Sequence, residues 1–261
     1  MNFKLHAPFQ PMGDQPEAIR GLVDGINNGF ASGEQTRSFE VVLPNNYTDS
    51  QNWPLLFIWH GLGGDIASML DGAGLREWAN TAGMILVAPQ ALDQGGTAAW
   101  DTLGDARNAD LALFDDLLTC SSKQWAVDSS RIYTLGMSDG GLFTGLLIAH
   151  RSSVLAAAAP FSGGILIDLD PDFTPLPVQV SWGGPNDTAD GQNFQTLAEA
   201  MIQDLQSENS FVIQCNHGLE HNLSPDFWPW TFQFFQDHPQ GVSPEPYQTE
   251  LPSLYPDYCS L

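Results

Sequence analysis

Between residue 36 and about residue 238, short runs of apolar residues alternate with longer segments in which apolar side chains recur at helical spacing. Nearly continuous apolar runs are typical of strands buried on both faces of a parallel sheet. Strands that alternate with helices favour a mostly parallel, doubly wound α/β sheet with helices on both faces. The predicted strands are Ser38–Leu43, Leu55–His60, Met84–Ala88, Arg131–Leu135, Leu155–Pro160, Val178–Trp182 and Phe211–Cys215. The predicted helices are Ala67–Thr81, Ala109–Thr119, Gly141–His150, Phe194–Gln206 and Trp228–Asp237.

Segments of different composition flank this α/β region. Residues 1–35 form a polar leader with one helical candidate, Gln15–Asn28, and residues 239–261 form a tail rich in proline and tyrosine. Because proline removes backbone donors and fixes the backbone, we expect the tail to be an extended segment packed on the domain surface. The chain therefore divides into a leader, one α/β domain over residues 36–238 and a tail, without internal repeats.

The strong negative charge of the chain argues against some classes of binding partner. The 261 residues carry 31 acidic and 8 basic side chains, a formal net charge of −23, and no lysine or arginine follows Arg151. Such a field repels nucleic acids and anionic lipid surfaces, so we expect neither as a partner. Two explanations of the charge stay open, adaptation to a saline environment and the ordinary solubility of an acidic surface.

The sequence contains neither a recognisable membrane helix nor a recognisable secretory signal. No apolar run reaches the ~18 residues of a membrane helix, and Lys4 is not followed by the apolar stretch of a secretory signal. The default expectation is therefore a cytoplasmic protein.

Three cysteines leave at least one unpaired. Cys120 and Cys215 are expected at opposite ends of the sheet, which argues against a bond between them, whereas Cys259 could pair with either.

The strongest chemical signal is the pentapeptide G-x-S-x-G at Gly136–Gly140, which follows a predicted strand and precedes an apolar helix. A strand, a sharp turn and a helix in this order form a nucleophile elbow. The turn strains the backbone at the serine, and only very small neighbours leave room for it. We therefore expect Ser138 to be exposed above the sheet, at the positive end of the helix dipole.

The residues after the later strands supply partners for this serine, because ligands bind beyond the carboxyl ends of strands in an open parallel sheet. Asp187 follows the sixth predicted strand, and we interpret it as the acid that orients a base; Asp190 is the alternative. His217 and His221 follow the seventh strand. We interpret His221 as the base and His217, which the strand end holds, as structural.

The order Ser138, Asp187, His221 matches the chain order of an α/β-hydrolase triad, with each member after a different predicted strand. In that arrangement His221 accepts the serine proton during attack on an ester carbonyl, and Asp187 holds the imidazole. The tetrahedral oxyanion then needs backbone donors. We expect them to be the N–H of Asp139 and the N–H of Leu62, which lies in the Gly-rich turn after the second strand.

Aromatic residues indicate where a substrate would bind. Trp59, Trp100 and Trp182 stand at or just after predicted strand ends, so we expect them to line an acyl or alcohol pocket. Trp228 and Trp230 follow the proposed base, and core packing explains them at least as well.

No insertion is long enough for a large lid, and Gly164–Phe173 is the best candidate for a short covering loop. An accessible cleft of this kind suits short-chain or polymeric esters. His60, His217 and His221 lack the spacing of zinc-ligand motifs, so we predict neither a metal nor a cofactor. We expect a monomer or small homo-oligomer whose partner is a small-molecule or polymeric ester.

Residues 36 to about 240 resemble the α/β-hydrolase esterases of the polyhydroxybutyrate depolymerase, feruloyl esterase and esterase D group. The resemblance rests on RSFEVVLPNNY, PLLFIWHGLGG, ILVAPQAL followed by Trp100, VDSSRIYTLGMSDGG, LAAAAPFSGG and CNHGLEH. It implies a serine esterase acting on hydroxyacid, phenolic-acid or acetylated-sugar esters, with the triad named above. It also implies secretion, because members of the group are mostly secreted.

The leader resembles a different family. Residues 1–36, above all the run FQPMGDQPEAI, are similar to the extreme N-terminus of the B subunit of the bacterial nucleotide-excision-repair excinuclease. In that family a phosphate-binding loop follows almost at once, whereas this chain contains no G-x-x-x-x-G-K-[ST] motif. We therefore expect no ATPase and interpret the leader as a fused or misassembled start. The alternative to an esterase is a non-catalytic binding protein with a hydrolase fold, and peptidase or thioesterase activity stays open because the same triad serves both.

Overall fold

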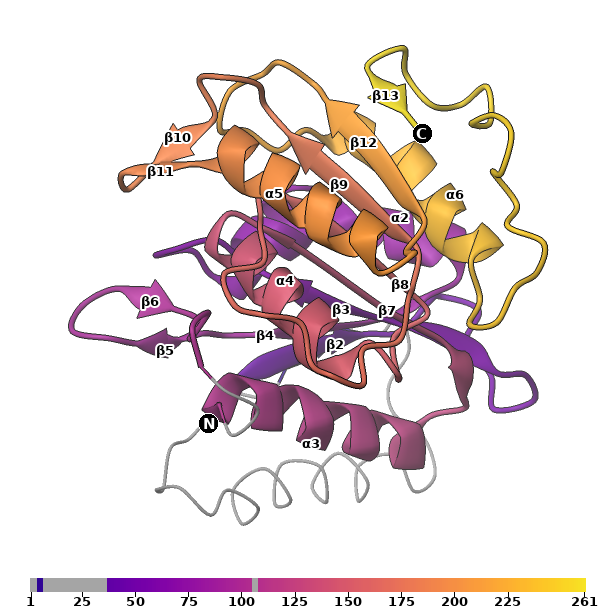
Figure 1. The fold of residues 1–261 in the computed structure, drawn as a ribbon. Coiled ribbons are helices and arrows are strands. Elements are labelled where there is room, and N and C mark those ends of the chain that lie inside the picture. Colours follow the sequence, from indigo (N-terminus) through magenta and orange to yellow (C-terminus); the bar gives the residue numbers. More distant parts are fainter. Residues whose placement is uncertain (1–3, 7–36, 105–107) are drawn as a thin grey trace.

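The computed structural model describes residues 4–6, 37–104 and 108–261. Within these residues, one sheet contains nine strands in the order β1-β2-β4-β3-β7-β8-β9-β12-β13 (Figure 1). The strands are β1 (Lys4–His6), β2 (Phe39–Val42), β3 (Trp53–Trp59), β4 (Ile85–Pro89), β7 (Val127–Met137), β8 (Ala157–Phe161), β9 (Val178–Trp182), β12 (Val212–Asn216) and β13 (Cys259–Ser260).

The inner strands of this sheet are parallel, as the sequence predicts. Each neighbouring pair from β4 through β3, β7, β8 and β9 to β12 runs in the same direction. Strands β2 and β13 run antiparallel to their neighbours β4 and β12. Since parallel strands end at one edge, the loops after β3, β7, β9 and β12 meet there, and this edge holds the candidate site.

Helices cover both faces of the sheet (Figure 1). Side chains alternate along each strand, so Leu55 and Phe57 of β3 pack in a core cluster with α3, α4 and α5, while Leu56 and Ile58 pack with α2 and α6. The helices are α2 (Leu75–Ala82), α3 (Ala109–Gln124), α4 (Asp139–Arg151), α5 (Phe194–Ser207) and α6 (Trp228–Asp237).

Several elements differ from the sequence prediction. The helix predicted over Ala67–Thr81 is two pieces, a short π-helix at Ser68–Gly72 and the helix α2. The break falls at Gly74, whose φ of 73° belongs to the left-handed region that ends a helix. Two small hairpins were not predicted, because strands of two residues are too short for a periodic signal. They are β5 (Leu92–Asp93) with β6 (Ala98–Ala99), and β10 (Thr188–Ala189) with β11 (Gln192–Asn193).

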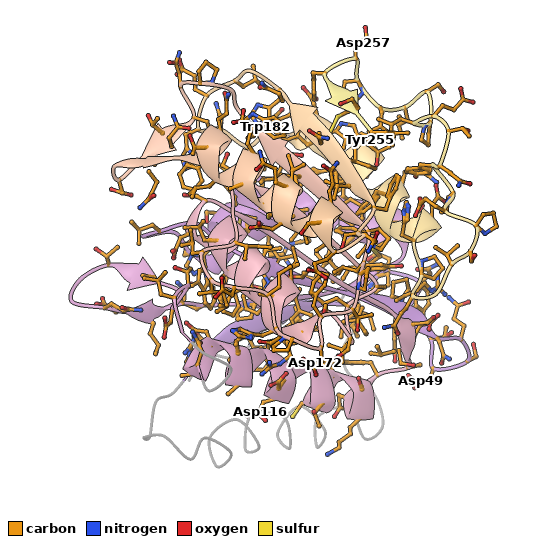
Figure 2. All side chains as sticks on the ribbon, viewed as in Figure 1. Asp49, Asp116, Asp172, Trp182, Tyr255 and Asp257 are labelled. Carbon is orange, nitrogen blue, oxygen red and sulfur yellow. A yellow bond between two sulfur atoms is a disulfide. The ribbon has the colours of Figure 1, made fainter. Side chains whose placement is uncertain are left out.

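The two flanking segments both contribute strands to the sheet. Part of the leader forms β1, which pairs in parallel with β2 and was not predicted. The helical candidate Gln15–Asn28 lies outside the described residues. The tail packs on the domain through Tyr247 and the labelled Tyr255, both buried, and then pairs with β12 as β13 (Figure 2).

One disulfide resolves the question of cysteine pairing. Cys215 of β12 is bonded to Cys259 of β13, where the two residues face each other across the antiparallel pair. Cys120 is free and lies in the last part of α3. The bond therefore fastens the tail to the strand that leads into the His217–His221 loop.

Candidate active site

The turn at Ser138 has the geometry of a nucleophile elbow. Ser138 joins β7 to α4 with φ 59° and ψ −120°, a backbone conformation that non-glycine residues rarely adopt. A Cβ added at Gly136 would lie 2.1 Å from the Gly140 carbonyl oxygen, and one at Gly140 would lie 2.1 Å from the Trp59 carbonyl oxygen. The close approach of three backbone segments therefore requires glycine at both positions.

The structure brings Ser138, His221 and Asp187 together in one series. His221 Nε2 lies 2.9 Å from Ser138 Oγ, and His221 Nδ1 lies 2.6 Å from Asp187 Oδ1. His221 is 83 residues from Ser138 and 34 from Asp187 in the chain, so the sheet topology brings them together. When the His221 imidazole is neutral, Ser138 Oγ–H donates a hydrogen bond to Nε2, and Nδ1–H donates a hydrogen bond to the Asp187 carboxylate.

The second oxygen of Asp187 is also fully engaged. Oδ2 accepts hydrogen bonds from Ser162 Oγ and from the backbone N–H of Gly183, each at 2.8 Å. Burial of this carboxyl by itself would raise its pKa, but the hydrogen bonds from His221, Gly183 and Ser162 outweigh burial and hold the pKa below its ordinary value. Asp187 is therefore an ionised, buried carboxylate with fixed orientation.

The alternative residues occupy different surroundings. Asp190 is exposed at the tip of the β10–β11 hairpin. His217 is buried, its Nδ1 accepts from the Leu219 N–H at 3.2 Å, and its ring packs on Phe227. Burial lowers the pKa of His217, against the opposing charge of Asp187. These contacts agree with a structural role for His217.

Close contact between two loops fixes the distance between Asp187 and His221. The Glu220 N–H donates to the Gly183 carbonyl at 3.0 Å, and a Cβ at Gly183 would lie 1.7 Å from the Glu220 carbonyl oxygen. The ring of Phe194, at the start of α5, stacks on the His221 imidazole with centroids 4.6 Å apart. Glycine at 183 therefore lets the loop after β12 deliver His221 to Asp187.

The Gly-rich turn after β3 lies against Ser138. A Cβ at Gly61 would be 3.4 Å from Ser138 Cβ. His60 Nε2 accepts from the Ala91 N–H at 3.0 Å, so the imidazole proton sits on Nδ1 and is donated to the Gly61 carbonyl at 2.8 Å. Because C=O and N–H of a trans peptide point in opposite directions, this bond turns the Leu62 N–H away from His60.

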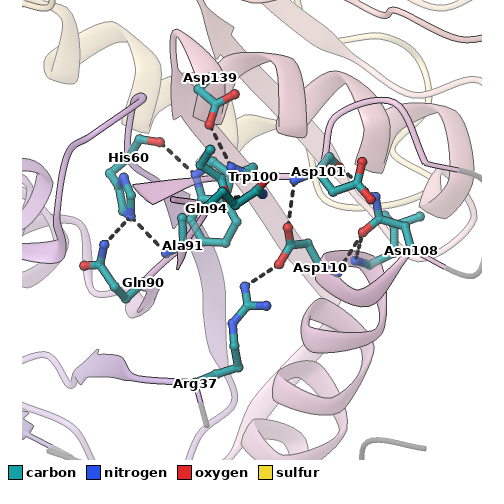
Figure 3. Close-up of polar contacts among 12 residues, drawn as sticks. Arg37, His60, Gln90, Ala91, Gln94, Trp100, Asp101, Asn108, Asp110 and Asp139 are labelled. Carbon is teal, nitrogen blue, oxygen red and sulfur yellow. Dashed lines mark hydrogen bonds and ion pairs between the residues drawn. The ribbon is translucent and has the colours of Figure 1, made fainter. Parts of the chain in front are cut away.

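Trp100 joins this turn to the elbow (Figure 3). Its backbone N–H donates to Asp139 Oδ2 and its indole N–H donates to the His60 carbonyl, both at 2.8 Å. Burial raises the pKa of Asp139 to about 6, although the Trp100 N–H opposes that rise. The two expected sources of oxyanion donors, Asp139 and the turn after His60, are thus tied to one residue.

A buried ion pair lies next to the Trp100 ring. Arg37 is bonded to Asp110 at the start of α3, and its guanidinium lies 6.0 Å from the centroid of the Trp100 ring (Figure 3). Asp110 also accepts from the Asp101 N–H at 2.8 Å, and Asn108 donates to the Asp101 carbonyl at 2.7 Å. The segment after β6 is therefore held on both sides.

The tryptophans expected to line a pocket are almost wholly covered. Trp59 is 0% exposed, and its indole N–H donates to Thr134 Oγ1 at 2.8 Å. Trp100 is 3% exposed and Trp182, labelled in Figure 2, is 7% exposed. The prediction of a pocket-lining role is wrong for Trp59 and Trp100, because both rings pack against each other and on Phe143 in the core.

Exposed leucines stand where the tryptophans were expected. Leu62 follows β3, Leu103 follows β6, and Leu219 follows β12, with exposed fractions of 43%, 70% and 51%. Sequence reasoning treated only Leu62 as a site residue, and for its backbone. Leu62 lies in the turn that packs against Ser138, and Leu219 lies in the loop that carries His221, so both leave apolar surface exposed near the polar series.

The segment Gly164–Phe173 does not cover Ser138. Its Asp170 N–H donates to the Ala149 carbonyl at 3.3 Å, and its Asp170 carboxylate binds His150 Nδ1 at 2.8 Å. These partners lie at the far end of α4, about 16 Å along the helix from the nucleophile. The prediction of a short covering loop here is therefore wrong.

Comparisons with known proteins place the fold and its relatives. No protein-family model matches the chain. The probable feruloyl esterase C of Aspergillus terreus is 26% identical over 223 residues, which cover 82% of this chain and 76% of that protein. The bifunctional acetylxylan esterase/xylanase XynS20E of Neocallimastix patriciarum is 24% identical over 74% of this chain and 28% of its own length.

Solved structures share the architecture at lower identity. The crystal structure of native pOPH matches with a TM-score of 0.68 and 16% identity, over 88% of this chain and 91% of pOPH. The Bacillus cereus carboxylesterase matches with a TM-score of 0.61 and 16% identity, over 82% of this chain and 98% of its own. The chain has the α/β-hydrolase fold. Among its described residues, no helix is long and apolar enough to cross a membrane.

Proposed function

We propose that this carboxylic-ester hydrolase of the α/β-hydrolase fold works through an acyl-enzyme formed on Ser138. The observation that carries the proposal is the hydrogen-bonded series Ser138–His221–Asp187 at a strand–turn–helix elbow. A strained serine next to an imidazole that a buried carboxylate orients is an activated nucleophile. A purely binding role is not favoured, because it needs no such series.

The reaction follows from these positions. His221 Nε2 takes the proton of Ser138 Oγ as that oxygen attacks the ester carbonyl carbon. Asp187 keeps the other imidazole proton on Nδ1 and stabilises the imidazolium that forms. The imidazolium then gives its proton to the departing alcohol oxygen, which leaves the acyl group on Ser138. A water molecule that His221 deprotonates attacks the acyl-enzyme, releases the acid and restores the serine.

We assign the oxyanion donors to the backbone N–H groups of Asp139 and Leu62. Asp139 is the first residue of α4, where N–H groups have no partner within the helix. The contact of Gly61 with Ser138 and the bond from His60 to the Gly61 carbonyl support the assignment of Leu62. Loss of one such donor typically costs ~2.7–4 kcal/mol in the barrier.

The substrate class that we favour is small esters of phenolic or acetic acid, with short hydroxyacid esters as the next choice. Support comes from the names of the relatives, a feruloyl esterase and an acetylxylan esterase. The exposed Leu62, Leu103 and Leu219 offer apolar contacts suited to an aromatic or short acyl group.

A panel of esters tests this assignment. We expect the wild type to hydrolyse methyl ferulate, p-nitrophenyl acetate and p-nitrophenyl butyrate, and to act poorly on p-nitrophenyl palmitate. Turnover that peaks at palmitate would contradict the substrate class and leave the mechanism standing. A folded wild type without turnover of any of the four esters would contradict the proposed function itself.

We further propose that the protein works in an oxidising compartment. The bond between Cys215 and Cys259 is of a kind that persists outside the reducing cytosol. This proposal replaces the default expectation of a cytoplasmic protein. Fractionation of the native host, with a thiol-alkylation assay on the recovered protein, tests it.

A further inference from the structure

We propose that Ser162 is a positioning residue that sets the orientation and basicity of the Asp187–His221 pair. The inference rests on the proposed function, because it concerns the same site. Ser162 follows β8, the strand that lies between the nucleophile strand β7 and the acid strand β9. Its side chain is completely buried, and its Oγ–H donates to Asp187 Oδ2 at 2.8 Å.

The place of Ser162 in the sheet links the nucleophile to the acid. The residue before it, Phe161, accepts the Ser138 N–H at its carbonyl at 3.0 Å. Ser162 itself donates its own N–H to the Ser181 carbonyl at 2.7 Å and its hydroxyl to Asp187. Two successive residues at the end of β8 therefore contact Ser138 on one side and Asp187 on the other.

The backbone at Ser162 is in a strained conformation. Its φ is 42°, in the left-handed region that glycine adopts freely and serine does not. A glycine at this position would remove that strain but would also remove the hydroxyl from Asp187. Strain at a non-glycine residue beside a functional group points to a role for its side chain.

The chemical consequence follows from the charge of Asp187. A donor to Oδ2 stabilises the carboxylate and draws electron density from the oxygen that faces His221. Without that donor the carboxylate attracts the imidazolium more strongly, so His221 becomes more basic, and both Asp187 and the imidazole that it orients are held less firmly. His217 also interacts with Asp187, whose negative charge opposes the lowering of the His217 pKa by burial.

Two variants separate the hydroxyl from the strain. Ser162→Ala removes the hydroxyl and keeps a Cβ at positive φ, whereas Ser162→Gly removes both. We expect both to lose roughly tenfold in kcat at little change in KM, the effect of one hydrogen bond to a charged group. We also expect the acid limb of the kcat/KM profile to move to higher pH in both, while thermal unfolding shows the glycine variant to be the more stable one.

Ser181→Ala is the matched control. Ser181 is an equally buried serine on β9, and its Oγ has no hydrogen-bond partner among the described residues. Its loss removes the same atom from the same core but leaves Asp187 untouched. We expect its acid limb and kcat to match the wild type.

A measurement independent of turnover completes the test. The proton shared by Asp187 and His221 gives a far-downfield resonance in proton NMR, and we expect it to shift in both Ser162 variants and not in Ser181→Ala. An unchanged resonance and an unchanged acid limb in both Ser162 variants would overturn the inference. Absent ester turnover in the wild type, by contrast, would refute the proposed function, while the NMR comparison would still decide the role of Ser162.

Discussion

The carboxylate of Asp139 accepts a hydrogen bond from the backbone N–H of Trp100 at 2.8 Å. Asp139, the residue after Ser138, is thereby tied to the chain that follows the β5–β6 hairpin (Figure 3). The indole of the same Trp100 holds the His60 carbonyl. One buried residue, through its backbone and its side chain, thus connects the elbow to the turn that carries the proposed second oxyanion donor.

Removal of the indole donor tests this connection. Trp100→Phe keeps an aromatic ring and the backbone N–H but leaves the buried His60 carbonyl without that donor. We expect kcat to fall about tenfold with little change in KM, because an unsatisfied buried carbonyl costs about 1–3 kcal/mol and the turn loosens. Steady-state kinetics with p-nitrophenyl butyrate provide the measurement.

Trp53→Phe is the matched control for this substitution. Trp53 also donates its indole N–H to a backbone carbonyl at 2.8 Å, that of Thr48, at the opposite end of β3. We expect it to lower stability without changing kcat. Equal losses of kcat in the two variants would mean that the Trp100 bond has no special connection to the site.

The raised pKa of Asp139 predicts a pH dependence of stability. Burial favours the protonated carboxyl and raises its pKa to about 6, above the value in an unfolded chain, so this contribution to stability is present at low pH and is lost as pH rises through 6. Asp139→Asn keeps an acceptor for Trp100 and cannot ionise. We expect it to match the wild type near pH 4 and to exceed its free energy of unfolding at pH 8, measured with urea.

The lowered pKa of Asp187 predicts the opposite pH dependence of stability. Its folded-state pKa is lowered, so its contribution to stability is present above the unfolded pKa and is lost as pH falls through the folded value. We therefore expect Asp187→Asn to be less stable than the wild type at pH 8 and to approach it in acid. Urea unfolding at the two pH values distinguishes the two carboxylates; parallel behaviour of both variants would contradict these surroundings.

The two histidines after β12 have separable roles. His221→Ala removes the proposed base, and we expect kcat to fall roughly 10⁴- to 10⁶-fold, as loss of a triad member does elsewhere. His217→Gln removes a buried ring that packs on Phe227, so it lowers the unfolding midpoint and leaves kcat within a few-fold. A large loss of kcat in a well-folded His217 variant would instead reverse the assignment.

We expect removal of the disulfide to lower the free energy of unfolding, and removal of the free cysteine to leave it unchanged. Cys215 and Cys259 close a loop of 44 residues, and the chain-entropy estimate for such a loop is about 4 kcal/mol. The double variant Cys215→Ser with Cys259→Ser should therefore lose up to this amount in urea unfolding. Cys120→Ser is the control and should unfold like the wild type, with or without reductant.

Much of the fold could be predicted because its signals are local. The inner strands are apolar runs with clear ends, and the order of Ser138, Asp187 and His221 after three of them indicates which loops meet. The structure brings these three side chains together as that order suggests. Their catalytic roles remain a proposal that kinetics must test.

The rest of the site could not be predicted from the sequence because it depends on packing. A tryptophan at a strand end gives the same sequence pattern whether its side chain faces solvent or, like that of Trp59, is buried beneath the site. The contact of Ser162 with Asp187 depends on one positive φ after β8, for which serine gives no signal. The pairing of Cys215 with Cys259 depends on a final strand of two residues, too short to detect.

The acidic surface has two explanations, adaptation to a saline environment and ordinary solubility. Asp49, Asp172 and Asp257 are exposed, Asp116 is half-buried, and Asp257 lies at the upper edge of the molecule in Figure 2. A comparison of unfolding midpoints in low and high salt separates these explanations. A rise of the midpoint through molar salt indicates adaptation to salinity, whereas a flat response indicates ordinary solubility.

The central claim is that Ser138 is the nucleophile, and covalent labelling tests it most directly. The wild type and Ser138→Ala are each treated with a fluorophosphonate, and intact mass and peptide mapping locate the adduct. We expect one adduct on Ser138 in the wild type, loss of ester hydrolysis in proportion to labelling, and neither labelling nor turnover in the variant. A folded wild type that stays unlabelled, or a Ser138→Ala protein that still hydrolyses p-nitrophenyl acetate at the wild-type rate, would contradict the account.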